Sequence, residues 1–318
     1  MNGTEIQEIL KKIGAELNGD PDHDSNVLLQ WAEQYRDEPG AEALVKALVS
    51  RARQLSAEEG PGLNEAVLRN TVLTAQEDHE EALRLIEQGL YDKALEKLLP
   101  LSELIDGYPL PDDTVWMDFN SYLDSLVYQD LFNEEIGGRE IGRHPMHPGR
   151  ILFTAGSLLI ETGRSEEALQ ILRQLNSYDP VCPKYIFELG EALKRTGRIK
   201  EALENALWGL TCAANRADMA RCYRDMGYCL TEAGDYENAV MLYQLSLLYA
   251  PSRHAEKEIV WIRQTTGREI RFDSAEVTAR CGELGIPLEL NETVLKNIEL
   301  LNMLFPPEEE GGEEAGRS

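Results

Sequence analysis

The segment GREIGRHPMHPGRILF, residues 138–153, holds the side chains of this chain that are best suited to chemistry. It contains His144 and His147, two of the five histidines, separated by two residues. Paired imidazoles can bind zinc or transfer protons, but a zinc site needs at least one further ligand. No Cys or His close in the sequence supplies it, and each histidine precedes a proline, which favours extended backbone. We therefore expect a structural connection, with metal binding or catalysis at His144 and His147 as the alternative.

Three arginines, Arg139, Arg143 and Arg150, lie around the two histidines, and Pro148 is suited to the first position of a helix. A helix N-terminus beside basic side chains can bind an anion. Intramolecular pairing with acids such as Glu134 is the other explanation. We favour pairing, because the chain has 57 acidic residues against 31 basic ones.

The elements that position these residues repeat one pattern of small side chains. A first helix carries a glycine, a turn glycine follows seven residues later, and an alanine follows five residues after that: Gly156, Gly163 and Ala168; Gly190, Gly197 and Ala202; Gly227, Gly234 and Ala239. Small residues let antiparallel helices approach closely, and a glycine readily adopts the left-handed conformation that ends a helix. The pattern predicts three stacked helix pairs.

This pattern resembles the tetratricopeptide repeat, a helix-turn-helix unit of about 34 residues. The resemblance implies an all-α fold, a right-handed superhelical solenoid of antiparallel helix pairs. We expect the array to span residues 75–253, with good copies at 149–182, 183–219 and 220–253, a weak copy at 75–108 and a degenerate copy at 113–148. The degenerate copy is expected to open with a helix over TVWMDFNSYLDSLVYQDLFNEE.

The flanking segments are expected to close the two ends of the array. Repeat arrays need atypical terminal units that cover the last apolar face. We predict helical caps over 1–58 and 254–305, a linker and helix start over 59–74, and a disordered acidic tail over 306–318. Within the C-terminal cap, REIRF (268–272) and IPLEL (286–290) are expected to pair as two short strands.

Composition argues against several classes of function. A net charge of −26 disfavours nucleic-acid and membrane-surface binding. The absence of a signal peptide, of a long apolar run and of any C-x-x-C favours a cytoplasmic protein with reduced thiols. No nucleotide-binding or hydrolase motif is present, so we expect a non-enzymatic protein without a cofactor.

The resemblance also implies a binding site, because first helices of tetratricopeptide arrays line a groove that binds peptides. Carried onto this sequence, the groove residues proposed for partner binding are Arg150, Phe153, Ser157, Lys184, Phe187, Lys194, Arg195, Arg221, Arg224 and Tyr228. Six bases face five acids at the groove positions, the acids being Glu161, Glu188, Glu191, Asp225 and Glu232. We expect the groove to bind a protein or peptide segment of acidic or C-terminal carboxylate character. The other reading is that these positions are solvated or pack between repeats.

The sequence is compatible with three functions. A protein-interaction scaffold comes first. A peptide-sensing regulator of the bacterial type comes second, and it would lack a DNA-binding domain because residues 1–60 show no basic recognition helix. An enzyme or metal protein acting through His144 and His147 comes third. The sequence does not indicate an oligomeric state.

Overall fold

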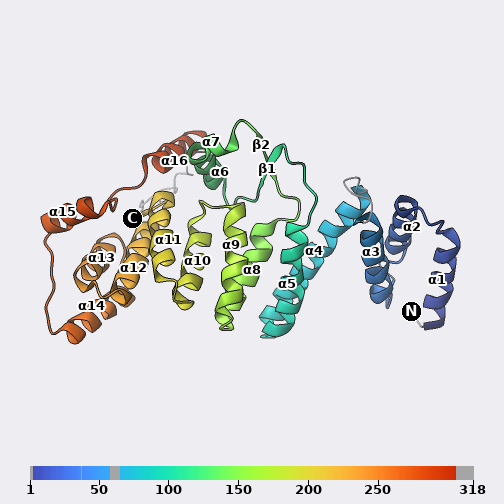
Figure 1. Cartoon of the computed structure of the whole chain (residues 1–318), viewed down its shortest axis with the longest axis horizontal. Coiled ribbons are helices and arrows are strands. Elements are labelled where there is room, and N and C mark those ends of the chain that lie inside the picture. The colour runs from blue at the N-terminus through green and yellow to red at the C-terminus, as the bar shows by residue number, and fades with distance from the viewer. Residues whose placement is uncertain (1–2, 37, 58–64, 306–318) are drawn as a thin grey trace, which may run out of the picture. The chain divides into compact units, whose positions relative to one another are not determined.

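A computed structural model describes all residues except 1–2, 37, 58–64 and 306–318 (Figure 1). The expected acidic tail and the first part of the expected linker therefore lie outside the described residues. The chain divides into two compact units, Met1–Asp112 (unit 1) and Asp113–Ser318 (unit 2).

The described part of unit 1 is helical. Its helices are α1 (Gly3–Glu16), α2 (Pro21–Gln34), α3 (Glu42–Ala57), α4 (Glu65–Glu87) and α5 (Tyr91–Asp106). Residues of α1, α2 and α3, among them Ile13, Leu28 and Leu48, form one buried apolar cluster. Helices α4 and α5 pack on each other across a turn at Gly89, whose φ is +72°. Ala82 and Ala94 are fully buried between them, as close helix packing requires.

Unit 2 contains a short mixed segment, a run of paired helices and a returning C-terminal segment (Figure 1). The elements of the mixed segment are β1 (Thr114–Met117), α6 (Tyr122–Leu131), α7 (Asn133–Ile136) and β2 (Glu140–Arg143). The paired helices are α8 (Pro148–Glu161), α9 (Ser165–Tyr178), α10 (Pro183–Arg195), α11 (Ile199–Cys212), α12 (Arg216–Glu232) and α13 (Tyr236–Tyr249). The last helices are α14 (Arg253–Thr266), α15 (Ser274–Leu284) and α16 (Glu292–Leu304).

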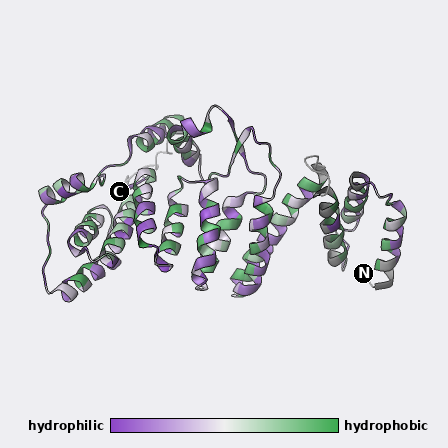
Figure 2. Ribbon diagram, in the orientation of Figure 1, coloured by the Kyte–Doolittle hydropathy of each residue, from purple (hydrophilic) through white to green (hydrophobic). Residues whose placement is uncertain are grey.

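The three expected helix pairs are present, and each helix from α8 to α14 packs on the next. Gly156 allows the closest approach, since a Cβ at that position would lie 2.5 Å from Leu172 Cδ2 on the paired helix. The turn glycines Gly163, Gly197 and Gly234 all have φ between +72° and +79°. Apolar and polar residues alternate around these helices (Figure 2), and the apolar faces meet inside the stack. The all-α repeat fold predicted from the sequence is confirmed.

The prediction of one helix starting at residue 114 is wrong. Thr114–Met117 forms β1, which pairs in parallel with β2 in the register Thr114 to Glu140. The helix α6 begins only after Ser121, whose hydroxyl caps it by accepting from the Asp124 N–H. The apolar residues Trp116, Phe119 and Leu123 have helical spacing, which favoured a helix. Trp116 instead pairs with Gly142 of β2, and local periodicity cannot reveal such a pairing.

The predicted strand pair near the C-terminus is also wrong. Residues 268–272 and 286–290 are both irregular rather than strands. The second segment instead packs against the repeats, where its carbonyl oxygens accept hydrogen bonds from the hydroxyls of Tyr223 and Tyr249. Buried tyrosine hydroxyls usually find such a partner, and an extended segment supplies carbonyls for it.

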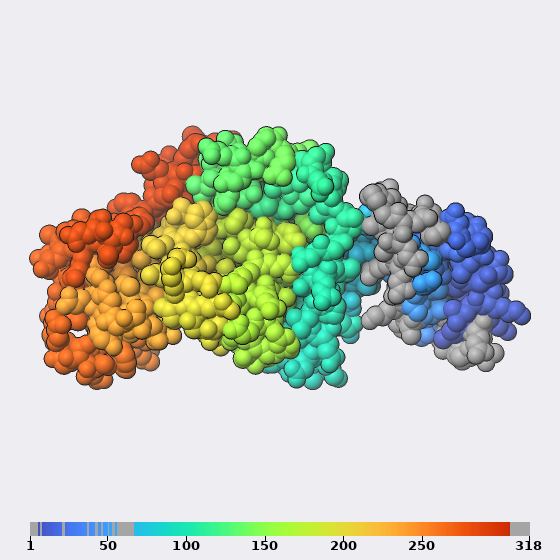
Figure 3. Space-filling model, in the orientation of Figure 1, coloured from blue at the N-terminus to red at the C-terminus, as the bar shows by residue number. Residues whose placement is uncertain are grey.

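The C-terminal segment returns along unit 2 to the mixed segment. Val277 and Cys281 of α15 join the buried cluster that contains Tyr223. Helix α16 packs on α6, where the Asn297 side chain donates to Asp130 at 2.9 Å. In Figures 1 and 3 the segment 113–147 and α16 lie together over one end of the helices α9, α10 and α11.

Candidate protein-binding face

The first helices of the three pairs, α8, α10 and α12, are neighbours, because α8 contacts α10 and α10 contacts α12. We call the surface formed by their predicted groove residues the first-helix face. Arg150, Lys184 and Arg221 occupy equivalent places on it, each six residues before the glycine of its first helix. The repeat therefore places one cation on each of the first helices α8, α10 and α12.

Two of these cations lie over aromatic rings of the preceding repeat. Lys184 Nζ is 3.7 Å from the centroid of the Phe153 ring, and Arg221 Cζ is 5.1 Å from that of Phe187. A cation over the face of an aromatic ring is attracted by the ring quadrupole. The rings thus hold the two cations in place while leaving their positive charge in position to meet an anion.

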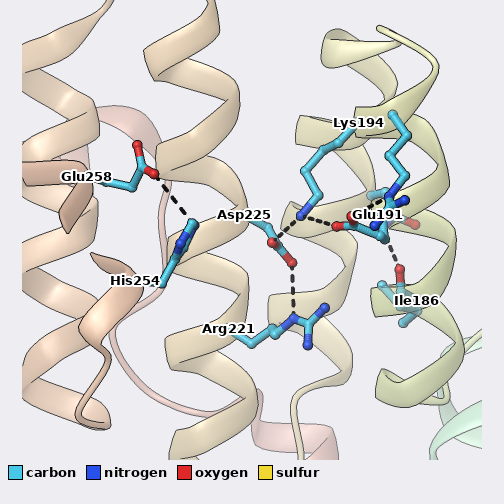
Figure 4. Close-up of polar contacts among 9 residues, drawn as sticks. Ile186, Glu191, Lys194, Arg221, Asp225, His254 and Glu258 are labelled. Carbon is cyan, nitrogen blue, oxygen red and sulfur yellow. Dashed lines mark hydrogen bonds and ion pairs between the residues drawn. The ribbon is translucent and has the colours of Figure 1, made fainter. Parts of the chain in front are cut away.

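Further along the first-helix face, opposite charges pair with each other (Figure 4). Lys194 Nζ lies 2.8 Å from Asp225 Oδ1 and 3.0 Å from Glu191 Oε2, so it joins two helices. Arg195 Nε donates to Glu191 at 2.8 Å. Arg221 Nε is 3.7 Å from the second oxygen of Asp225. This end of the face is therefore an internal ion-pair network.

The network shifts the pKa values of Lys194 and Glu191. Burial acts to lower the pKa of Lys194, but Asp225 and Glu191 outweigh burial and raise it. Burial acts to raise the pKa of Glu191, but Arg195 and Lys194 outweigh it and leave the pKa below its ordinary value. Both groups stay charged near neutral pH, and their pairing stabilises the contact between α10 and α12.

The other predicted site residues lie as follows. Arg150 and Lys184 are exposed, and neither has an ion-pair partner among the described residues. Arg224 is half-buried, burial lowers its pKa, and its Nη1 has no hydrogen-bond partner within the described part of the chain. Ser157 donates to Glu188 at 2.9 Å. The Tyr228 ring lies 5.6 Å from Lys194 Nζ.

His144 and His147 have separate environments. His144 is buried, accepts the Met146 N–H at its Nδ1 and packs edge-on against Tyr178 at 5.3 Å. His147 precedes α8 with a left-handed φ of +52°, and its Nδ1 is 3.4 Å from Asp118 Oδ1. Among the described residues, neither belongs to a group of three side chains able to hold a metal ion.

Asp118, which sequence reasoning did not single out, organises this connection. It is buried, and its Oδ2 accepts the N–H of Gly149 at 2.9 Å in the first turn of α8. Its Oδ1 accepts from Arg143 Nε at 3.2 Å. The anion at this helix N-terminus is thus the protein's own carboxylate, as a helix dipole favours. No local pattern links Asp118 to Gly149.

The three arginines of the opening segment have different roles. Arg139 donates to the backbone carbonyls of Ile136 and Glu135 at 3.1 and 2.9 Å. Arg143 pairs with Asp118, and Arg150 lies on the first-helix face. Arg139 and Arg143 line a cavity of about 780 Å³ in the segment 113–147.

A second group missed by sequence reasoning is buried between α6 and the turn from α9 to α10. One ligand atom each from Asp124, Asp179 and Cys182 lies within 4.8 Å of the other two. Burial, followed by the charge of Asp124, raises the pKa of Asp179 to about 8. Burial also raises the pKa values of Asp124 and of the Cys182 thiol. Only the tertiary fold brings these three residues together.

The geometry defines a helical-repeat protein with a charged first-helix face. The sequence model described as "Tetratricopeptide repeat" matches residues 149–182, the pair α8 and α9. Residues 149–182 are thus a tetratricopeptide repeat, and two further helix pairs carry glycine and alanine at the same positions. Tetratricopeptide repeats serve in general as protein-interaction scaffolds.

Solved structures show similar chains at low identity. One is YrrB, described as a tetratricopeptide-repeat protein with an unusual peptide-binding site, at 13% identity and a TM-score of 0.39 over 79% of this chain and 99% of that one. Another is the MamA RS-1 ArsTM double mutant, at 9% identity and a TM-score of 0.34 over the same shares. None of the curated proteins matches the sequence. In the described ranges, no helix has the length and apolar character needed to cross a bilayer.

Proposed function

We propose that this protein is a non-enzymatic interaction scaffold whose first-helix face binds an acidic segment of another protein. The observation that carries the proposal is the row of Arg150, Lys184 and Arg221 at equivalent positions of successive repeats. The chain has a net charge of −26, so this row of positive side chains differs in sign from the net charge of the protein. An acidic partner would be attracted to this row and repelled by most of the remaining surface.

The arrangement suits a partner that crosses the first helices in succession. Such a segment would meet a cation on each first helix, and each exposed pair of a cation with a carboxylate contributes about 0.2–1 kcal/mol. The Phe153 and Phe187 rings lie beside the cations and offer apolar contact.

The ion-pair network around Lys194 would act as the rigid part of the site. Its charges satisfy one another across α10 and α12, so they are not available to a partner without loss. The preference for acidic segments would therefore come mainly from Arg150 and Lys184. Arg221 would add a third cation that is shared with the network, because its Nε lies 3.7 Å from Asp225. Of the ten residues that the sequence analysis proposed for partner binding, those in the N-terminal halves of α8, α10 and α12 would therefore determine the preference for acidic segments.

Peptide binding measured by fluorescence anisotropy tests the proposal. The probes are a set of labelled twelve-residue peptides rich in Asp and Glu, each with a counterpart in which Asn and Gln replace the acids. The variant Lys184→Glu changes the first-helix face. Lys200→Glu makes the same charge change on α11, where the Lys200 side chain is 90% exposed.

The proposal predicts that wild type and Lys200→Glu bind acidic peptides alike, whereas Lys184→Glu binds them at least about tenfold more weakly, the equivalent of 1.4 kcal/mol. Added salt should weaken wild-type binding, because the contacts are near the surface. Equal affinity for acidic and amide peptides, or equal loss in both variants, would contradict it.

The state of the cysteines supports a reducing, cytoplasmic setting for this scaffold. All five cysteines are buried and none forms a disulfide. Burial raises the pKa of the Cys229 thiol to about 11, which keeps it protonated and unreactive at neutral pH. Mass spectrometry of the protein alkylated under native and denaturing conditions in the cell lysate would detect five reduced thiols, and an oxidised pair would contradict this setting.

A further inference from the structure

The cluster of Asp124, Asp179 and Cys182 contains carboxylate oxygens that no described group of the protein satisfies. The three residues are 6%, 0% and 1% exposed. Asp124 Oδ2 and Asp179 Oδ1 have no hydrogen-bond partner in the described part of the chain. The other Asp179 oxygen is held by the N–H of Asn120 at 2.8 Å, which fixes the carboxylate and leaves one oxygen free.

No basic side chain offsets this buried negative charge. Neither carboxylate forms an ion pair with a described Lys, Arg or His. The further charge that acts on Asp124 comes from Asp218, another acid. A buried carboxylate without a counter-ion is costly, so the cluster must either hold protons or bind a cation.

The chemistry of the ligand atoms indicates which species. A thiol sulfur and two carboxylate oxygens match the soft and hard ligands that zinc accepts, at about 2.3 Å for sulfur and 2.0–2.2 Å for oxygen. Calcium takes six to eight oxygen ligands, and magnesium an octahedron of oxygens, so neither suits this set. One short turn supplies two of the ligands, since Asp179 is the C-cap of α9 and Cys182 the N-cap of α10.

We propose that Asp124, Asp179 and Cys182 form a binding site for a single thiol-preferring divalent cation of the zinc class. On binding, the Cys182 sulfur gives its proton to solvent and donates an electron pair to the cation, and each aspartate donates through one oxygen. The three residues leave a fourth position for water. Because Asp124 lies in α6 and the others lie in the α9–α10 turn, the cation fastens the segment 113–147 to the repeats. This role is independent of peptide binding on the first-helix face.

Cobalt binding to the full chain tests the proposal. Chelator-treated protein is titrated with Co²⁺, and thiolate-to-cobalt charge-transfer absorption in the near ultraviolet is recorded. Zinc bound to the untreated protein is counted by elemental analysis. The variants are Cys182→Ser and Asp124→Asn, and Cys229→Ser removes a buried thiol of α12 as the matched control. Circular dichroism establishes that each variant is folded.

The proposal predicts one equivalent of Co²⁺, a charge-transfer band in wild type and Cys229→Ser, and loss of the band in Cys182→Ser. Zinc should raise the Tm of wild type and leave that of Asp124→Asn unchanged, because an amide is a poor zinc ligand. Asparagine resembles a protonated aspartate in shape, so this variant should fold. Absence of both the band and the Tm shift in wild type would overturn the proposal. A proton shared by the carboxyls of Asp124 and Asp179 would then account for the buried pair.

Discussion

The ammonium nitrogen of Lys184 lies 3.7 Å from the centre of the Phe153 ring, which belongs to the preceding repeat. The pair Arg221 and Phe187 repeats this relationship one unit later, at 5.1 Å. The cations Lys184 and Arg221 thus each lie over an aromatic ring of the repeat before their own. The stacking of the helix pairs both stabilises the array and sets the spacing of its surface cations.

A double-mutant cycle on Phe153 and Lys184 should detect this contact. Phe153→Leu and Lys184→Met each remove one partner, and the double variant should be more stable than the sum of the two losses predicts. The expected coupling is about 0.5–1 kcal/mol, as for a cation–π pair near the surface. Urea unfolding of the four proteins measures it, and strictly additive losses would show that the two side chains do not interact.

Gly156→Ala should destabilise the protein by about 1–3 kcal/mol through overpacking. The added methyl group would lie 2.5 Å from Leu172 Cδ2 and 2.7 Å from its Cγ, inside a fully buried contact. The equivalent change Gly190→Ala is the control, because its methyl group would meet only the end of the Asn205 side chain at 3.0 Å. Thermal unfolding should rank Gly156→Ala below Gly190→Ala, and the reverse order would refute the packing argument.

Asp118→Ala should lower the free energy of unfolding by about 1–3 kcal/mol, since it leaves the buried Gly149 N–H without its acceptor. Asp118→Asn keeps an acceptor oxygen and should lose less. His147→Ala removes only a 3.4 Å contact to the same carboxylate and should lose least. Urea unfolding of the three variants gives the order. A larger loss for His147→Ala would mean that the histidine, rather than the aspartate, organises this connection.

The Glu191 carboxylate should make stability fall on acidification. Its pKa is below the ordinary value of 4.5 in the folded protein, because the ion pairs with Arg195 and Lys194 outweigh burial. Its ionised form therefore stabilises the fold above about pH 4.5, and this contribution is lost as the pH falls through the lowered pKa. Glu191→Gln should be less stable than wild type at pH 7, and the difference should shrink towards pH 3. A difference that is constant with pH would contradict the ion pairs.

The repeat fold was predictable because its signals are local. Gly156, Gly163 and Ala168 lie within one helix pair, and the same spacings return in the next two. The strand pairing of Thr114 with Glu140 was missed because two distant segments form it, and the helical spacing of apolar residues around Trp116 misled. The prediction of strands at 268–272 and 286–290 was wrong for the same reason. Hydroxyls of the repeats, and not a second strand, donate hydrogen bonds to backbone carbonyls of residues 286–290.

The repeat register selects the residues of the first-helix face, but it does not say how their charges pair. The repeat register placed Lys184 and Arg221 on this face, and the same register sets Lys194 beside Asp225 on the next helix, a pairing of opposite charges that a helix-by-helix comparison would have found. A count of bases and acids could not show it. Asp118 carried no local signal, because its partner Gly149 lies in another element.

The reactivity of individual lysines tests the central claim, that the first-helix face binds an acidic segment, most directly. Wild-type protein is treated briefly with a small acylating reagent, with and without a saturating acidic twelve-residue peptide, and modification at Lys184 and Lys200 is quantified by mass spectrometry. Both side chains are exposed in the free protein, so both should react. The account predicts that the peptide slows modification of Lys184 severalfold and leaves Lys200 unchanged. Equal slowing of both lysines, or protection of Lys200 alone, would contradict it.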